Sequence, residues 1–265
     1  MATQRSSHLI VRQVTQATFH ALISERPAVV LVRSGEKSIR RGTSRLALGP
    51  GRLAVIPAGE PLTIENKPEA GLYMASAVVL GTEMLPLGDP TRVASDDRAL
   101  TAFERAAAAC EDPLLPSTVR EHLVKEVLLW LAQEGVGASP TRVQGLVPRL
   151  RELLSQDLAA DWTGPMAAQR LGVSEATLRR RLAGEGTGFA DVLADLRMTR
   201  ALSMLQTTVL PINRIALDVG YDSPSRFAGR FRARFGIAPS AVRGWVDRIG
   251  TTFDRARAVS TNKVR

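Results

Sequence analysis

The strongest constraint on the fold is a pattern of helix, glycine turn and capped helix that occurs twice in the second half of the chain. In the first copy, Gly172 follows one amphipathic segment and Ser174 precedes another. In the second copy, Gly220 and Ser223 take the same places, and the two serines are 49 residues apart. Glycine adopts the positive φ that a tight turn needs, and serine is a preferred N-cap. The pattern therefore predicts two helix-turn-helix units.

We place the first unit at residues 162–184 and the second at residues 211–235. In the second unit, Phe227, Phe231 and Phe235 recur every four residues. This spacing puts the three rings on one helix face, so we expect that face to be buried. The opposite face, with its arginines and small side chains, is then left for a partner.

Residues 189–206, between the two units, have the apolar period of one long helix. A rigid helix of this kind could hold two recognition helices one DNA turn apart, about 34 Å. The alternative, a helical bundle without DNA binding, does not explain why two similar units occur at this spacing.

The positive charge of the chain is concentrated in this helical half. The chain has 35 basic and 26 acidic side chains, which gives a formal net charge of +9. Residues 1–140 carry 15 of each sign, whereas residues 141–265 carry 20 basic and 11 acidic side chains. A basic domain beside a neutral one favours a polyanionic partner. On charge alone, a cationic surface without such a partner explains the pattern equally well.

Residues 162–243 resemble the DNA-binding domain of the AraC/XylS transcription regulators. The motifs that carry the resemblance are Leu171-Gly-Val-Ser174, Thr177-Leu-Arg-Arg-Arg-Leu182, Glu185-Gly-Thr-Gly-Phe189, Ile215-Ala216, Gly220-Tyr-Asp-Ser223, Phe227-x-x-x-Phe231 and Phe235-Gly-Ile-Ala-Pro239. The resemblance implies a regulator that binds promoter double-stranded DNA with both recognition helices, in adjacent major grooves. It also implies RNA polymerase as a partner if the protein is an activator.

The candidate DNA-binding residues lie on the outer faces of the two second helices. They are Ala176, Thr177, Arg179, Arg180, Ser223, Ser225, Arg226, Arg230 and Arg232. Arginine bound to guanine is the commonest specific contact in the major groove. In the second unit, Ala228-Gly229 stands where the family often has Ser-Arg. The arginines there can still hold phosphates, which position a protein without specifying sequence, so base readout by the second helix stays open.

The first 90 residues have the pattern of short β-strands. Apolar segments separated by glycine and proline predict strands at 28–33, 44–48, 52–56, 62–66 and 72–80. Many short strands at this spacing indicate an antiparallel sandwich or barrel. Two helices are expected within residues 95–134, the first beginning at Asp96 and the second capped by Ser117.

The segment Gly51-x5-Pro57-x-Gly59-x2-Leu62-x3-Asn66 resembles the second motif of the cupin superfamily, and an upstream Gly35 fits the first. The three positions that carry metal-binding histidines in cupins are Arg41, Thr43 and Leu62 here. A transition-metal site needs converging imidazoles or carboxylates, so we expect neither a metal nor another cofactor.

AraC-type regulators commonly pair such a barrel with their DNA-binding domain. The pairing implies a metal-free, cupin-like sensor barrel with an apolar interior, which modulates DNA binding and responds to a small effector of unknown identity. It also implies helices that form a homodimer. A docking module without a ligand is the alternative for the barrel. We expect Arg33 to be a solvated strand end rather than a contact for a ligand carboxylate.

These expectations define an α+β chain of two domains. A cupin-like sensor and dimerisation domain covers residues 1–134 and a linker covers 135–147. An AraC-type DNA-binding domain follows at 148–250. We expect a basic, disordered tail at 251–265.

Composition excludes several classes of protein. Hydrophobic residues make up 45% and charged residues 23% of the chain, as in globular proteins. No apolar run approaches the ~20 residues that span a bilayer, and no signal peptide is evident. With the single Cys110, which cannot form an internal disulfide, these features predict a cytoplasmic protein without a membrane partner.

An enzyme and a non-specific DNA-binding protein are the two alternatives to a sequence-specific regulator. An enzyme would need either the absent metal ligands or a reactive Cys110, and the neighbouring Glu111 and Asp112 would raise the pKa of that thiol. A non-specific architectural protein would bind DNA with a steep salt dependence. Activation and repression are not distinguished by the sequence.

Overall fold

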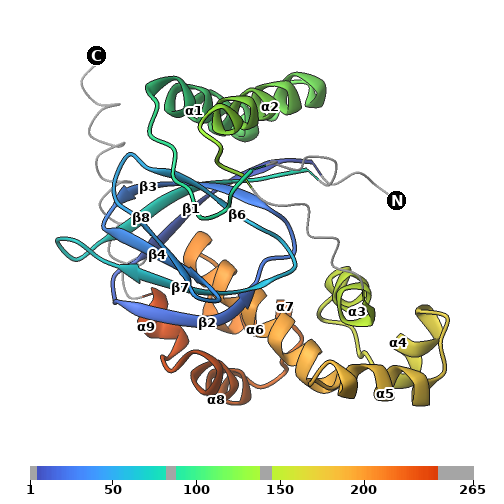
Figure 1. The fold of residues 1–265 in the computed structure, drawn as a ribbon. Coiled ribbons are helices and arrows are strands. Elements are labelled where there is room, and N and C mark those ends of the chain that lie inside the picture. Colours follow the sequence, from blue (N-terminus) through green and yellow to red (C-terminus); the bar gives the residue numbers. More distant parts are fainter. Residues whose placement is uncertain (1–4, 82–87, 138–144, 244–265) are drawn as a thin grey trace.

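A computed structural model describes residues 5–81, 88–137 and 145–243. Along the chain, an all-β region is followed by a pair of helices and then by an entirely helical region (Figure 1). The predicted α+β class is therefore confirmed. The predicted basic tail lies outside the described residues, as does most of the predicted linker.

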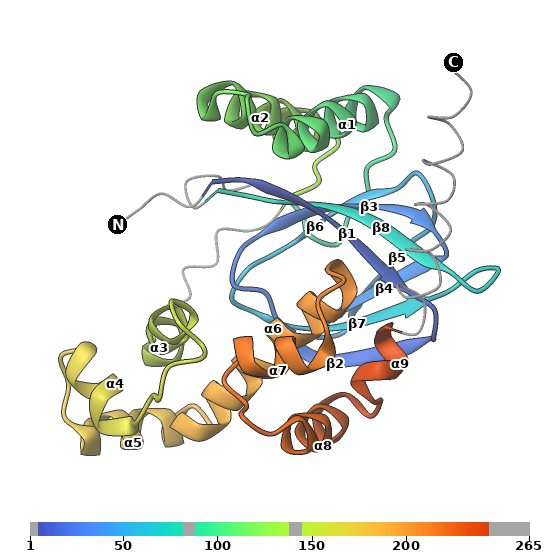
Figure 2. The same ribbon diagram turned by 180° about the vertical axis from the view of Figure 1, so that it is seen from behind.

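Eight strands form two four-stranded antiparallel sheets in the described part of the chain. The strands are β1 (Ser7–Gln13), β2 (Ala17–Ile23), β3 (Ala28–Ser34), β4 (Glu36–Arg41), β5 (Ser44–Leu48), β6 (Leu53–Ile56), β7 (Pro61–Lys67) and β8 (Tyr73–Val79). One sheet has the order β1-β8-β3-β6 and the other the order β2-β7-β4-β5. The two sheets face each other as a barrel-like sandwich, with β2 at the edge of the second sheet (Figures 1 and 2).

The five predicted strands correspond to β3 and to β5 through β8. The sequence patterns did not indicate β1, β2 or β4. Strand β4 is the clearest case, because it reads Glu-Lys-Ser-Ile-Arg-Arg and carries a single large apolar side chain, Ile39. Its remaining side chains are charged or polar, so the segment lacks the apolar content on which strand prediction depends.

The space between the two sheets is filled with apolar side chains. Val32, Leu48, Leu62 and Tyr73 are each at most 2% exposed there. Alternate residues of β3 point away from this core, and two of them, Val29 and Leu31, are covered by helices. Burial on both faces explains why β3 reads as a continuous apolar run.

Those covering helices are α1 (Asp97–Glu111) and α2 (Ser117–Gln133). Helix α1 begins one residue later than predicted, because Asp96 is its N-cap and not its first residue. The N-cap of α2 is Pro116 and not Ser117, which is already the first helical residue. The expectation for Arg33 was wrong. Arg33 pairs with Glu104 of α1 and donates to the Ser76 hydroxyl, so it fastens the helix to the sheet instead of ending in solvent.

Seven helices make up the rest of the described chain. They are α3 (Leu146–Ser155), α4 (Gly164–Arg170), α5 (Glu175–Gly184), α6 (Phe189–Thr207), α7 (Ile212–Asp218), α8 (Pro224–Phe235) and α9 (Pro239–Arg243). Helices α4 and α5 are the first predicted unit, α7 and α8 are the second, and α6 is the predicted long helix between them. Pro211 is the N-cap of α7 and lies just outside the helix.

Each unit has its own apolar core. In the first unit, Leu178 and Leu182 of α5 pack with Leu150 and Leu154 of α3. In the second unit, Phe227, Phe231 and Phe235 are buried on one face of α8, as their spacing predicts.

The core of the second unit also contains two side chains from the barrel. Ala17 and Phe19 of β2 are 7% and 1% exposed and belong to the same buried cluster as the α8 phenylalanines. The ring of Phe19 meets that of Phe235 edge to face, with centroids 5.7 Å apart. The second unit is therefore packed onto the barrel, beside β2 (Figure 1).

Both turn glycines have the positive φ that was predicted, +70° at Gly172 and +81° at Gly220. They differ in their surroundings. A Cβ atom at Gly172 would meet nothing within 4 Å, whereas one at Gly220 would lie 2.6 Å from the Arg197 guanidinium and 2.8 Å from the Leu158 carbonyl oxygen. Gly220 is required by both its backbone conformation and its close packing.

We predict that Gly220→Ala lowers the free energy of unfolding by about 1–3 kcal/mol, because the side chain is strained and overpacked. Gly229→Ala is the matched control. Gly229 lies inside α8 with open space around it, so alanine there should leave stability unchanged or raise it by up to about 1 kcal/mol. Urea unfolding of both variants measures the difference, and equal stabilities would contradict the close packing at Gly220.

Candidate DNA-binding surface

The first recognition helix, α5, begins at a side-chain cap. The Ser174 hydroxyl accepts from the Thr177 amide at 3.2 Å and lies 2.9 Å from the Thr177 hydroxyl. Thr177 is half-buried. This candidate residue therefore helps to start the helix, which limits its hydroxyl as a base contact.

Beyond the cap, α5 exposes one polar face. Ala176, Arg179 and Arg180 are exposed, while Leu178 and Leu182 anchor the opposite face. The small Ala176 leaves room for close approach to a partner, and the two arginines directly follow Leu178 in the sequence. A helix with this arrangement suits the major groove.

The second recognition helix, α8, is built in the same way. The Ser223 hydroxyl caps it by accepting from the Arg226 amide at 3.3 Å. Four further candidate residues are exposed along the helix: Ser225, Arg226, Arg230 and Arg232. Around Gly229 the helix surface is open. Ser223 is thus the N-cap that the sequence predicts. The exposed side chains form a cationic face on α8.

The arginines of these two faces are not engaged by the protein. Among the described residues, none of Arg179, Arg180, Arg226, Arg230 and Arg232 takes part in an ion pair. Guanidinium groups free of carboxylates keep their charge and donors available for phosphates or base edges. In both views, α5 and α8 lie at the lower edge of the molecule, away from α1 and α2 (Figures 1 and 2).

Other arginines of the helical region are structural. Arg197 of α6 donates to the carbonyl oxygens of Leu158, Ala160 and Gly220, at 2.9 to 3.1 Å, and so connects the two units. Sequence reasoning missed this role. The signal was its position four residues after Leu193, on the apolar side of α6.

A second structural group centres on Asp195, also in α6. Its carboxylate binds Arg151 of α3 at 3.0 Å and Arg234 of α8 at 2.9 Å. Arg151 is only 8% exposed. Arg234 is thus directed toward the protein and not toward the outer face of α8.

The three positions of the cupin histidines have different surroundings. Leu62 is buried between the sheets, Arg41 pairs with Glu60, and Thr43 is exposed in the turn between β4 and β5. Within the described ranges, no group of three or more histidine, cysteine, aspartate or glutamate side chains could hold a metal ion.

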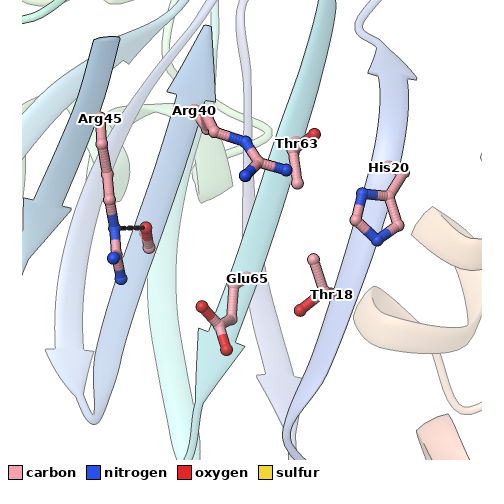
Figure 3. Close-up of a pocket in the computed structure, with 7 residues that line it drawn as sticks. Thr18, His20, Arg40, Arg45, Thr63 and Glu65 are labelled. Carbon is pink, nitrogen blue, oxygen red and sulfur yellow. Dashed lines mark hydrogen bonds between the residues drawn. The ribbon is translucent and has the colours of Figure 1, made fainter. Parts of the chain in front are cut away.

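A polar pocket lies on the outer face of the second sheet and not between the sheets. It has a volume of about 280 Å³ and is open to solvent. Figure 3 shows side chains from β2, β4, β5 and β7 around it. They are Thr18, His20, Ser38, Arg40, Arg45, Thr63 and Glu65. The interior of the barrel is apolar, as expected, but side chains fill it. The pocket lies outside the barrel and is polar.

A buried lysine lies at the end of the barrel next to α6. Lys37 is 6% exposed, and its ammonium donates to the Asn66 Oδ1 at 2.8 Å. Asn66 donates in turn to Gln13, and Gln206 of α6 donates to the same Gln13 oxygen, both at 3.0 Å. This chain of hydrogen bonds links the barrel to the helical region.

Burial lowers the pKa of Lys37 to about 7. Its ammonium lies 5.4 Å from the centre of the Tyr73 ring. Burial also raises the pKa of Tyr73, whose hydroxyl has no hydrogen-bond partner among the described residues. Among the described residues, the Lys37 ammonium therefore has Asn66 as its hydrogen-bond acceptor, and the Tyr73 hydroxyl has none.

Cys110 is half-buried against the core under α1 and α2. Burial is the main cause that raises the pKa of its thiol to about 11, with Glu121 and Glu111 adding to it. The expected direction holds, although the sequence argument named the neighbouring acids rather than burial. A thiol of this kind is a poor nucleophile.

Known proteins resemble the helical region in sequence. Residues 167–244 match the family model described as a helix-turn-helix domain. The transcriptional activator CfaD and the dual transcriptional regulator Rns, both of Escherichia coli, are each 34% identical over 91 residues, which is 34% of this chain and 34% of theirs. The C-terminal region is therefore a helix-turn-helix domain that is similar to those of transcription regulators.

A longer match is found with the transcriptional regulator GadX of Escherichia coli, 28% identical over 149 residues and 54% of each chain. The chain therefore spans about a third to a half of the length of these curated relatives. All three are named as transcription regulators.

The whole fold has solved counterparts. ToxT from Vibrio cholerae superimposes with a TM-score of 0.63, covering 89% of this chain and 97% of that one at 11% identity. A second ToxT structure, with an unsaturated fatty acid bound, gives a TM-score of 0.62 at 10% identity, covering 91% of this chain and 94% of that one. At this identity the likeness concerns the fold alone, a β domain of two sheets beside a helical region.

None of the helices within the described residues is both long enough and apolar enough to cross a membrane.

We predict that Lys37 makes stability depend on pH. Because its folded pKa is near 7 and its unfolded value near 10.5, the unfolded chain binds more protons between these values. The free energy of unfolding should therefore rise with pH from about 7 to 10, by up to about 1.4 kcal/mol per pH unit. Below pH 7 the penalty is constant. Lys37→Met should remove this slope in chemical unfolding, and an unchanged slope would contradict the assignment.

Proposed function

We propose that the protein is a sequence-specific transcriptional regulator that binds promoter DNA through α5 and α8. The observation that carries this proposal is the pair of capped helices with exposed arginine faces, free of ion pairs within the described residues. The family of the C-terminal region and the names of the relatives support it. The excess of positive charge in the same half of the chain is a further support.

The long helix α6 suits a two-groove geometry. Its 19 residues correspond to about 28 Å at 1.5 Å per residue, which approaches the ~34 Å of one DNA turn. We propose adjacent major grooves on one face of the DNA as the binding mode.

The two helices are proposed to contribute differently. Arg179 and Arg180 of α5 would read base edges. Arg226, Arg230 and Arg232 of α8 would hold phosphates, since the helix carries Ala228-Gly229 at its centre and offers no long side chain there. Sequence preference then comes mainly from the first unit.

We predict that Arg180→Ala weakens binding to a selected DNA site by ~1–3 kcal/mol and relaxes the preference at one position. Arg230→Ala is the matched variant on α8. It should weaken binding to all sequences about equally and lower the salt slope by about 1. Titrations at several salt concentrations, against the selected site and unrelated DNA, measure both. Wild-type binding without sequence preference would instead support an architectural protein.

We propose a homodimer and a cytoplasmic protein, as in the expectations from the sequence. Helix α2 supports the dimer, because Leu129 is 68% exposed and Val119 43% exposed on a helix whose other side covers the barrel. RNA polymerase is a proposed partner if the protein activates transcription, as the relative CfaD is named to do. The relatives are regulators, which favours a non-enzymatic role over a repair or cupin enzyme.

We also propose that the N-terminal domain modulates DNA binding by responding to an anionic ligand. Within the described residues, no carboxylate hydrogen-bonds to the buried Lys37, and the Tyr73 hydroxyl is unpartnered. Buried charges are normally paired, so a carboxylate beside Lys37 would satisfy its ammonium. The ToxT structure with a bound fatty acid makes a long-chain carboxylate a reasonable first probe.

We expect oleate to raise the melting temperature of the full chain and oleyl alcohol, which lacks the charge, to leave it unchanged. Lys37→Met should abolish the shift by oleate, because the ammonium that pairs with the carboxylate is gone. An equal response of wild type and variant would remove Lys37 from the proposal. No response of wild type would favour a different anion or a barrel without a ligand.

A further inference from the structure

Strand β2 carries a bulge at the point where the second helix-turn-helix unit meets it. The register between β2 and β7 shifts between Phe19 and Leu22, and Ala21 has a φ of +49°. Strand β2 is the edge of its sheet. Bulges at sheet edges redirect the backbone and release groups from the ladder. Here the bulge leaves the carbonyl oxygens of His20 and Ala21 available to another element.

Arg234 of α8 binds both of these carbonyl oxygens. Its Nη1 donates to His20 at 2.8 Å and its Nη2 to Ala21 at 3.0 Å, while its Nε donates to Asp195 at 2.9 Å. The planar guanidinium, with donors in a fixed fork, suits three acceptors at once. Arg234 therefore joins the barrel, the recognition helix and the long helix α6.

Two other contacts reinforce this connection. Phe19, one residue before the bulge, is buried against Phe235, one residue after Arg234. Farther along the same interface, Gln206 of α6 donates to Gln13 at the end of β1. Aromatic pairs of this kind contribute about 0.5–1.5 kcal/mol beyond the burial of their area.

The barrel meets the helical region through β1, which packs on α6, and through β2, which packs on α8 of the second unit. Helices α4 and α5 of the first unit pack with α3 and α6, in a core without a barrel side chain among its described members. The second unit, in contrast, shares its core with Ala17 and Phe19. The barrel thus fixes one of the two recognition helices.

This contact leaves the recognition face of α8 uncovered. Ser225, Arg226, Arg230 and Arg232 stay exposed while Arg234 and Phe235 hold the end of the helix. A support that does not cover the binding face lowers the entropy lost on binding. The geometry therefore favours preorganisation for DNA over occlusion.

We propose that strand β2 is a docking support that holds the second unit in place for DNA binding, with Arg234 as the positioning residue. The inference rests on the proposed function. It assigns Arg234 to the barrel and not to the DNA backbone, and it makes the β2 bulge the point at which the N-terminal domain controls DNA affinity.

The test uses the full chain and a duplex selected by wild type from random DNA, together with two derivatives that each keep one half of the site. Arg234→Gln should weaken binding to the whole duplex about tenfold, within the usual range of coupling between sites. It should leave binding unchanged on the derivative that keeps only the half read by the first unit. Without DNA, hydrogen exchange should accelerate in β2 and in the last turns of α8.

Two further variants separate this role from general destabilisation. Phe19→Leu conserves an apolar side chain of similar size and removes the ring contact. As in Arg234→Gln, binding to the whole duplex should weaken, and hydrogen exchange in β2 and α8 should accelerate. Arg214→Ala removes a charge from the exposed side of α7, where Arg214 pairs only with Asp218 within the described chain. It should leave the exchange of β2 unchanged.

Three results would be decisive against the proposal. Unchanged exchange in Arg234→Gln would show that the contact does not hold the unit. Faster exchange with tighter binding would make the barrel an inhibitor of the second unit. Equal binding by Arg234→Gln and wild type would also overturn it. If wild type selects no duplex at all, the proposed function fails first, and that outcome is distinct from these three.

Discussion

The structure depends on a hydrophobic core that two parts of the chain build together. Phe19 of β2 lies among Phe227, Phe231 and Phe235 of α8, and each fully buried phenylalanine contributes roughly 1.5–3 kcal/mol. A helix-turn-helix unit is small, and a small unit buries little surface by itself. The strand that completes its core therefore determines where the unit sits, and the barrel becomes part of the scaffold of the second recognition helix.

Polar groups at the same interface restrict how the two parts can meet. Apolar burial is non-directional, whereas the carbonyl oxygens of His20 and Ala21 accept from Arg234 in only one arrangement. The hydrogen bonds from Lys37 through Asn66 and Gln13 to Gln206 add a second restriction. A partly satisfied buried network is costly, and this network connects Lys37 to Gln206 of α6. Core and network together give the N-terminal domain a physical route to DNA binding.

The sequence revealed most of what depends on local chemistry. Gly172 and Gly220 at positive φ, the Ser174 and Ser223 caps and the phenylalanine stripe of α8 are all local signals, and each was predicted. Strand β4 was missed because its neighbours in space, not its composition, make it a strand. The roles of Arg234 and Arg197 were missed for the same reason, since their acceptors lie up to 214 residues away in the chain. The arginine faces were predictable, but the division between DNA-facing and structural arginines required tertiary contacts.

The two recognition helices therefore have different tasks in the proposed regulator. Helix α5 has the small and basic side chains that suit base readout, and within the described residues its unit packs on α3 and α6. Helix α8 has Ala228-Gly229 at its centre, arginines suited to phosphates, and a fixed attachment to the barrel. Phosphate contacts supply affinity more than specificity, so control through β2 changes how tightly the protein binds without changing which sequence it prefers. A ligand bound by the barrel would then change the fraction of DNA sites that the protein occupies, while the set of sites stays the same.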